Sequence, residues 1–219
     1  DGILNVNGTG NTTISNAVGT TSLKEINVAA ATGKTAEFGS TAGAATITMS
    51  GAGTAQFDGA VTATNFNITG NGTVDIRASS TLTTLSGSGG TIKNDGSSNV
   101  TITTGGATDS SFSGVIADGA TNSLAITKTG SGALTLSGTN TYTGTTTVSA
   151  GTLIAAGNAA ALGAGTLTMS GGKLQLVDNT GLNFGRNTTV SSSSEIDSGR
   201  LSGAGAGTTN TLGTLSING

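Results

Sequence analysis

The sequence predicts an all-β protein that folds as a right-handed parallel β-helix, a β-solenoid with roughly 17 to 22 residues in each coil. Three observations predict this class: short bursts of alternating apolar and polar residues, a glycine-led pattern that returns at a regular spacing, and 38 Gly without any Pro in 219 residues. The alternative is an antiparallel β-sandwich, which is also built from short, evenly spaced strands. Because the chain begins at Asp1 rather than Met, residues 1–219 are expected to be one β-helix domain or a fragment of one.

The expected strands are short stretches in which every second residue is apolar, each followed by Gly, Asn, Asp or Ser. They return about every ten residues, at residues 3–6, 47–49, 66–68, 74–76, 100–102, 124–126, 134–136 and 174–176. Only residues 158–163 resemble a helix, where Asn158 is placed as a cap before three Ala and a Leu.

A longer period comes from a Ser/Thr-Gly pattern that precedes an alternating apolar pair. Its lead glycines are Gly33, Gly51, Gly70, Gly87, Gly130 and Gly171. The steps between the first four are nearly equal, and the steps to Gly130 and then to Gly171 are each close to twice as long. A unit of this length cannot bury its own apolar face, so roughly ten to twelve coils are expected to stack into a rod of parallel sheets.

Alignment of the repeats predicts which side chains face the narrow core. The inward pairs are Ala36 and Phe38, Ala55 and Phe57, Val74 and Ile76, and Leu134 and Leu136. The residues between them should point to solvent, namely Glu37, Gln56, Asp75 and Thr135. Glycine allows positive φ at the corners, and the lack of Pro leaves every backbone N–H available for the ladders.

Composition excludes several kinds of activity. The chain has no His and no Cys, so it cannot form a Ser-His-Asp triad, a Cys-His pair or a thiolate zinc cluster. The net charge is −3 and the eight basic residues are spread singly, so no nucleic acid is expected as a partner. The longest apolar stretches, 153–156 and 159–162, are far shorter than the ~20 residues needed to cross a bilayer, so no membrane-spanning segment is expected.

Residues 124–153 carry a specific pattern. Lys128-Thr129-Gly130-Ser131-Gly132 leads into Ala133-Leu134-Thr135-Leu136, and Asn140-Thr141-Tyr142-Thr143-Gly144 follows. Together with residues 161–169 and 171–176, this pattern resembles the autotransporter-associated β-strand repeat, or passenger-associated transport repeat, of bacterial autotransporter passenger domains. The resemblance covers residues 115–176. It implies a secreted surface β-helix exported through an outer-membrane barrel, and it is linked to that export rather than to one activity.

Two groups of charged residues are candidates for chemistry. Glu195 and Asp197 flank Ile196, so both carboxylates should lie on one side of a strand, roughly 7 Å apart, a separation that suits glycoside hydrolysis. Glu37, Asp75 and Lys93 hold nearly the same position in successive repeats and would form a charged stripe. A β-helical polysaccharide lyase would need such acids, usually with calcium. For Glu195 and Asp197 we favour a solvated outer face with Ile196 pointing inward. For the stripe we favour an exposed ladder whose mixed charges limit sheet-to-sheet aggregation.

Two further motifs are assigned no chemistry. Gly33-Lys34-Thr35 matches only the end of a phosphate-binding loop, because Val28 stands where that motif needs a Gly. Tyr142, the only Tyr, falls inside the repeat pattern and is expected to pack at a strand end. No residue is therefore assigned to catalysis, to a cofactor or to a metal.

The sequence thus predicts an extracellular structural or adhesive stalk on a bacterial cell surface, not an enzyme. Its Thr/Ser/Asn-rich faces would meet a host surface or an extracellular polysaccharide. The alternative is a subunit that assembles with itself, end to end, into a filament or surface layer, because neither 1–14 nor 201–219 carries an evident cap. A polysaccharide-acting β-helix enzyme is the third hypothesis.

Overall fold

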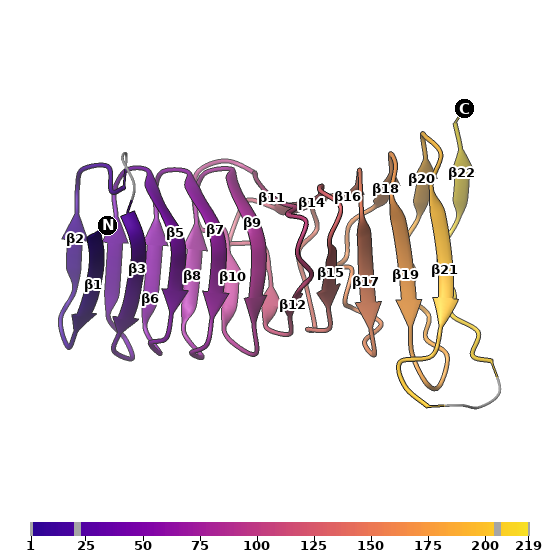
Figure 1. Ribbon diagram of the computed structural model, residues 1–219, viewed down its shortest axis with the longest axis horizontal. Helices are drawn as coiled ribbons and strands as arrows, with labels where there is room; N and C mark the ends of the chain where they lie inside the picture. The colour runs from indigo at the N-terminus through magenta and orange to yellow at the C-terminus, as the bar shows by residue number, and fades with distance from the viewer. Residues whose placement is uncertain (1, 20–22, 204–206, 219) are drawn as a thin grey trace.

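The computed structural model describes residues 2–19, 23–203 and 207–218, and these form a β-solenoid rod of about nine turns. Figure 1 shows the strands side by side along the rod, with the N-terminus and the C-terminus at opposite ends. Every strand pair is parallel, so the predicted parallel β-helix is confirmed and the antiparallel sandwich is excluded. The described residues form no helix, and so none that is long and apolar enough to cross a membrane.

The described strands belong to two sheets. The larger holds sixteen strands, namely β1 (Gly2–Gly8), β3 (Leu23–Ala30), β5 (Ala42–Met49), β7 (Val61–Ile68), β9 (Ser80–Gly87), β11 (Val100–Thr104), β12 (Ser110–Phe112), β14 (Leu124–Lys128), β15 (Ala133–Leu136), β16 (Thr146–Val148), β17 (Thr152–Ala156), β18 (Leu167–Met169), β19 (Lys173–Val177), β20 (Thr188–Val190), β21 (Glu195–Gly199) and β22 (Leu215–Ile217). The smaller holds six, namely β2 (Thr12–Ile14), β4 (Thr35–Phe38), β6 (Thr54–Phe57), β8 (Thr73–Ile76), β10 (Thr91–Lys93) and β13 (Val115–Ile116).

The larger sheet changes its form at β9. Before β9 each coil gives it one strand of seven or eight residues, and beyond β9 each coil gives it two shorter strands. Residues at the start of β9 pair with β11, and Gly87 at its end pairs with Phe112 of β12. Two rows of strands therefore continue from one, and the six-stranded sheet ends at β13 in the same region.

The coils are less uniform than the sequence predicted. Ala36, Ala55 and Val74 are neighbours in successive coils, and equal numbers of residues separate them in the chain. The coil that joins the paired residues Ile102 and Ile126 contains more residues, and the coil that joins Val190 and Ile217 contains more still. The predicted coil length therefore holds for most coils but not for these. The longer coils explain why the chain makes about nine turns rather than ten to twelve.

The core is a set of inward-facing columns along the rod axis. All the predicted inward residues are buried, and the Phe38 and Phe57 rings stack with centroids 4.8 Å apart. Burial of aliphatic and aromatic side chains in these columns is the main favourable contribution to folding, at about 25 cal/mol per Å². Because each coil shields the one before it, the core needs no wide interior.

The expected helix at residues 158–163 is instead a turn. Asn158 does act as a cap, since its Oδ1 accepts a hydrogen bond from the Ala160 N–H at 2.9 Å. The Ala161 N–H donates to the Asn158 carbonyl and the Gly163 N–H donates to the Ala160 carbonyl, so the backbone bonds are those of tight turns. Ala161 and Leu162 point into the core, which fixes this segment as a corner of the coil.

The lead glycines do not lie in one column. Gly70 lies on Gly51, and a Cβ at Gly70 would come 2.4 Å from the Gly51 carbonyl oxygen. Gly87, in contrast, pairs with Ile68. Gly130 has φ of +66° and lies on the backbone of Gly105. The remaining two lie elsewhere: Gly33 has open space around its Cα at φ of +72°, and Gly171 lies against Ser149.

Candidate functional site

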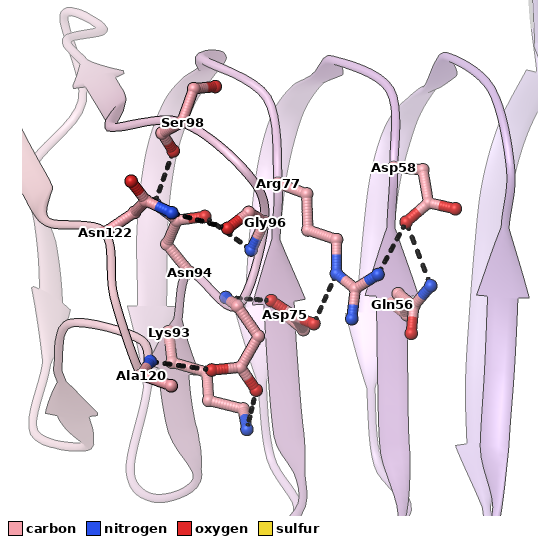
Figure 2. A network of polar contacts seen from close by, with 11 residues as sticks. Gln56, Asp58, Asp75, Arg77, Lys93, Asn94, Gly96, Ser98, Ala120 and Asn122 are labelled. Carbon is pink, nitrogen blue, oxygen red and sulfur yellow. Dashed lines mark hydrogen bonds and ion pairs between the residues drawn. The ribbon is translucent and has the colours of Figure 1, made fainter.

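The charged stripe predicted from the repeat alignment is present on the six-stranded sheet. Strand pairing places Glu37, Gln56, Asp75 and Lys93 in one outward-facing row. We call this row, together with the adjoining Asp58, Arg77 and Asp95, the charged ladder. Figure 2 shows its central part, in which side chains from successive coils reach one another along the rod.

Asp75 is the centre of the charged ladder. Its Oδ2 accepts a hydrogen bond from Arg77 Nε at 2.7 Å, and its Oδ1 accepts one from the Asp95 backbone N–H at 2.8 Å. The expectation that Asp75 faces solvent is therefore wrong in one respect. The side chain points outward, but its neighbours cover it and the residue is only 2% exposed.

Asp58 and Asp95, the other acids of this network, are also paired with cations (Figure 2), whereas Glu37 accepts a hydrogen bond from Thr13 Oγ1 at 3.3 Å. Arg77 Nη1 lies 3.3 Å from Asp58 Oδ1, which also accepts a hydrogen bond from Gln56 Nε2 at 2.9 Å. Lys93 Nζ forms an ion pair with Asp95. The hydrogen bond from Lys93 is the main cause that lowers the pKa of the Asp95 carboxyl. For Arg77, burial lowers the pKa, but the hydrogen bond from Arg77 to Asp75 and the charge of Asp75 together outweigh this effect. The pKa of Arg77 is therefore raised.

A shallow hollow of about 450 Å³ lies over this network, lined by Asp58, Arg77, Asp95, Gly96 and Ser97. The described part of the chain contains no group of three or more His, Cys, Asp or Glu residues placed to hold a metal ion. Each carboxylate in the hollow already accepts hydrogen bonds from a cation, an amide or a backbone N–H. The ladder is therefore arranged to join coils through paired charges.

The second carboxylate pair lies on β21. Glu195 and Asp197 are on one side of the strand, as predicted, and Lys173 from β19 lies between them. Lys173 Nζ is 2.9 Å from Glu195 Oε1 and 3.0 Å from Asp197 Oδ2. These hydrogen bonds raise the pKa of Lys173, and the one to Asp197 lowers the pKa of that carboxyl. A glycosidase needs one of its two carboxyl groups to carry a proton, and a shared cation disfavours that proton.

A third cluster lies inside the rod around Lys128. This residue follows Leu124 and Ile126 on the inward face of β14 and is 2% exposed. Its Nζ donates hydrogen bonds to the carbonyl oxygens of Thr129, Gly130 (3.1 Å) and Ala150 (3.4 Å). Burial lowers the pKa of Lys128, against the opposing charge of Asp109. The ammonium thus joins the turns of two successive coils.

Asn140 joins coils where the six-stranded sheet ends. It is 3% exposed, and its Oδ1 accepts a hydrogen bond from the Ile116 N–H of β13 at 2.8 Å. Its Nδ2 donates to the Ala161 carbonyl in the next coil at 2.7 Å. The side chain therefore supplies the Ile116 N–H with the acceptor that a following strand would have supplied.

Tyr142 packs at the same corner and is fully buried. Its hydroxyl lies 2.6 Å from Thr146 Oγ1, and Thr146 donates in turn to the Leu162 carbonyl. Burial raises the pKa of Tyr142 to about 12, so the phenol stays neutral and serves as a hydrogen-bond donor. Gly163 lies against the ring, since a Cβ there would come 2.6 Å from Tyr142 Cζ.

Comparison with known proteins finds one family match, and it overlaps these residues. Residues 126–155 match the model of one family, the passenger-associated transport repeat. The chain carries a passenger-associated transport repeat. Together with the β-solenoid, this repeat fits a passenger-type repeat domain of an autotransporter. No curated protein and no solved structure matches the chain.

The transport repeat contains several of the buried polar residues of the rod. Lys128, Asn140, Tyr142 and Thr146 all fall within the matched residues. Reasoning from the sequence identified only Tyr142 among these four. A signal for Lys128 was available, because it occupies the third apolar position of Leu124-Ala125-Ile126-Thr127-Lys128, where a charged residue has to find partners inside the coil.

Proposed function

We propose that this chain is a non-catalytic stalk of a bacterial surface protein that stands outside the cell and presents Thr/Ser/Asn-rich faces for adhesion. The transport repeat and the β-solenoid support a passenger-like stalk. A solenoid suits this role because its length grows with each coil while its cross-section stays constant. The hydrogen-bonding faces that run along it are the feature proposed to meet a host surface or an extracellular polysaccharide.

One observation carries the proposal, a row of hydroxyl side chains on the larger sheet. Strand pairing aligns seven Thr in consecutive coils, namely Thr62, Thr81, Thr103, Thr127, Thr147, Thr168 and Thr189. Neighbouring strands lie about 4.8 Å apart, so this threonine row offers donors and acceptors at a regular spacing. All seven are partly or fully exposed.

Paired charges support the non-catalytic part of the proposal. Every carboxylate of the two candidate clusters except Glu37 forms an ion pair with Arg77, Lys93 or Lys173. General acid or base catalysis requires a group that exchanges its proton near the working pH. Incubation with a panel of acidic and neutral polysaccharides should therefore release no shorter products, and the appearance of such products would overturn this part.

Adhesion is tested with two sets of variants that remove the same groups from different faces. The triple variant Thr127→Ala, Thr147→Ala, Thr168→Ala shortens the threonine row. The control Thr54→Ala, Thr73→Ala, Thr91→Ala removes aligned hydroxyls from the six-stranded sheet.

Binding of each purified chain to a glycan array and to immobilised extracellular matrix is measured. We expect the first variant to lose binding and the control to keep it. Equal binding by both variants, or no binding by the unaltered chain, would contradict the adhesive role.

A further inference from the structure

The outer surface of the rod separates charged residues from hydroxyl residues. Charges gather on the six-stranded sheet, in the charged ladder. In the larger sheet, β14, β16, β18 and β20 follow one another along the rod (Figure 1). The only charged residue in these four strands is Lys128, which points inward and is buried. This part of the larger sheet therefore presents an uncharged polar surface.

The hydroxyl groups on this surface form three parallel columns, with the threonine row in the middle. Six residues that alternate outward on two successive coils form the hydroxyl array, namely Thr145, Thr147, Ser149, Thr166, Thr168 and Ser170. The neighbouring coils continue the middle column with Thr127 and Thr189. No shift in register interrupts the pairing of β14, β16, β18 and β20, so the columns run straight along the rod.

The protein itself holds the two outer columns of the hydroxyl array. Thr145 Oγ1 lies 3.2 Å from Thr166 Oγ1, and Ser149 Oγ lies 3.1 Å from Ser170 Oγ. In the middle column, the hydroxyl groups of Thr147 and Thr168 have no hydrogen-bond partner among the described residues. Threonine is also β-branched, which restricts its side-chain rotation. The middle column is therefore both ordered and available to a ligand.

The spacing of the hydroxyl array indicates which ligand it fits. Neighbouring coils lie about 4.8 Å apart, and alternate residues of one strand lie about 6.6–6.8 Å apart. On a prism face of hexagonal ice, the oxygen atoms form a rectangular net whose two repeats are close to these distances. Water molecules over a few coils can therefore bind the protein hydroxyl groups and keep their places in the ice. A charged side chain would instead hold a hydration shell of its own.

A surface that binds ice must prefer ordered water to liquid water. A single hydroxyl group has no such preference, because it binds water in either state. Holding a liquid water molecule in place costs entropy, whereas a water molecule in ice is already immobile. Several fixed hydroxyl groups in register therefore bind ice more strongly than they bind the liquid. The threonine methyl groups add to this preference, because the contact removes them from liquid water.

We propose that the hydroxyl array is an ice-binding face, and that its ligand is the ordered water of a prism face of ice. The array shares the threonine row with the adhesive function proposed above, but it takes a different ligand and does not depend on that function. Because the protein covers the ice to which it binds, water cannot add at the covered places. The chain should therefore also slow the growth of large ice crystals at the expense of small ones.

Ice grown slowly from a dilute solution of the whole chain tests the proposal. Such ice excludes solutes that do not bind it, so a bound protein is recognised by its enrichment in the ice fraction. We expect the chain to be enriched in the ice and to keep crystals small when a frozen solution is held just below its melting point. Exclusion of the folded chain from the ice would overturn the proposal.

Two double variants then test whether the hydroxyl array is the binding face. Thr147→Lys, Thr168→Lys adds charges to its middle column, and we expect enrichment in the ice to fall about tenfold or more. The matched control Thr54→Lys, Thr73→Lys makes the same change at paired positions of the six-stranded sheet and should be enriched as the unaltered chain is. Equal enrichment of the two folded variants would show that ice binds elsewhere and would overturn the proposal.

Further controls separate ice binding from misfolding and from adhesion. Circular dichroism establishes that each variant keeps its β structure. If a Lys variant loses it, the milder Thr147→Ala, Thr168→Ala and Thr54→Ala, Thr73→Ala replace the two variants, with the same expected order of effects. A chain that binds ice but no glycan or matrix supports the ice-binding face and contradicts only the adhesive role. A chain that binds a glycan but is excluded from ice gives the opposite result.

Discussion

At the scale of single residues, the molecule depends on small side chains at places where two coils approach closely. Gly163 combines two such demands. Its φ is +69°, a conformation that a side chain disfavours, and its Cα faces the buried ring of Tyr142. Gly33 has only the unfavourable backbone conformation. Its φ is +72°, but a Cβ added there would meet no atom of a neighbouring coil within 4 Å. The pair therefore separates the effect of backbone conformation from that of packing.

We expect Gly163→Ala to lower the free energy of unfolding by about 2–4 kcal/mol, the sum of a left-handed backbone and an overpacked ring. Gly33→Ala should cost only about 1–2 kcal/mol, from the backbone alone. Urea denaturation followed by circular dichroism measures both. Equal losses in the two variants would show that the Tyr142 ring makes room for a methyl group, contrary to the packing described above.

At the scale of structural elements, successive strands of the six-stranded sheet are joined by side chains as well as by their backbones. Lys93 on β10 pairs with Asp95, whose Oδ1 also accepts a hydrogen bond from the Ala120 N–H in the next coil. The pKa of Asp95 is lowered from its ordinary value of 3.8, first by the hydrogen bond from Lys93. The folded state therefore binds fewer protons at this site than the unfolded state.

It follows that the contribution of Asp95 to stability is present above pH 3.8 and is lost as the pH falls through its lower folded value. Lys93→Met should thus lower the free energy of unfolding near neutral pH, and its difference from the unaltered chain should shrink on acidification. The control Lys24→Met removes a lysine from an exposed position on another sheet. Urea denaturation between neutral and acidic pH measures all three. A difference that stays constant with pH would refute the role of the ion pair.

At the scale of the whole molecule, stability is shared between neighbouring coils. A coil inside the rod is covered on both sides, whereas β1 and β22 each have one neighbouring strand among the described residues. The transport repeat adds buried hydrogen bonds of Lys128, Asn140 and Tyr142 to coils that are already covered on both sides. Local opening should therefore be easiest at the ends of the rod.

Amide hydrogen exchange should reveal this gradient. We expect the slowest exchange in β14, β15 and β17 and the fastest in β1 and β22. Uniform exchange along the rod would mean that the coils open together rather than from the ends.

The sequence by itself determined the fold class, the inward-facing columns and the charged row. Alternation decides which side chains a strand buries, and a repeated length forces like positions to stack, so Phe38 on Phe57 and Gln56 beside Asp75 were predictable. The transport repeat was equally visible, because its pattern is continuous in the chain.

Only the tertiary structure decided which residues of neighbouring coils contact one another, because the number of residues in each coil varies. Asp75 is buried because Arg77 and the backbone of Asp95 happen to close over it, and Lys128 is satisfied by the carbonyl of Ala150 in the next coil. The turn at 158–163 and the division of the sheet after β9 depend on loops whose lengths vary between coils. Local patterns specify which face a side chain takes, but coil closure and the covering neighbours set its partners and its exposure.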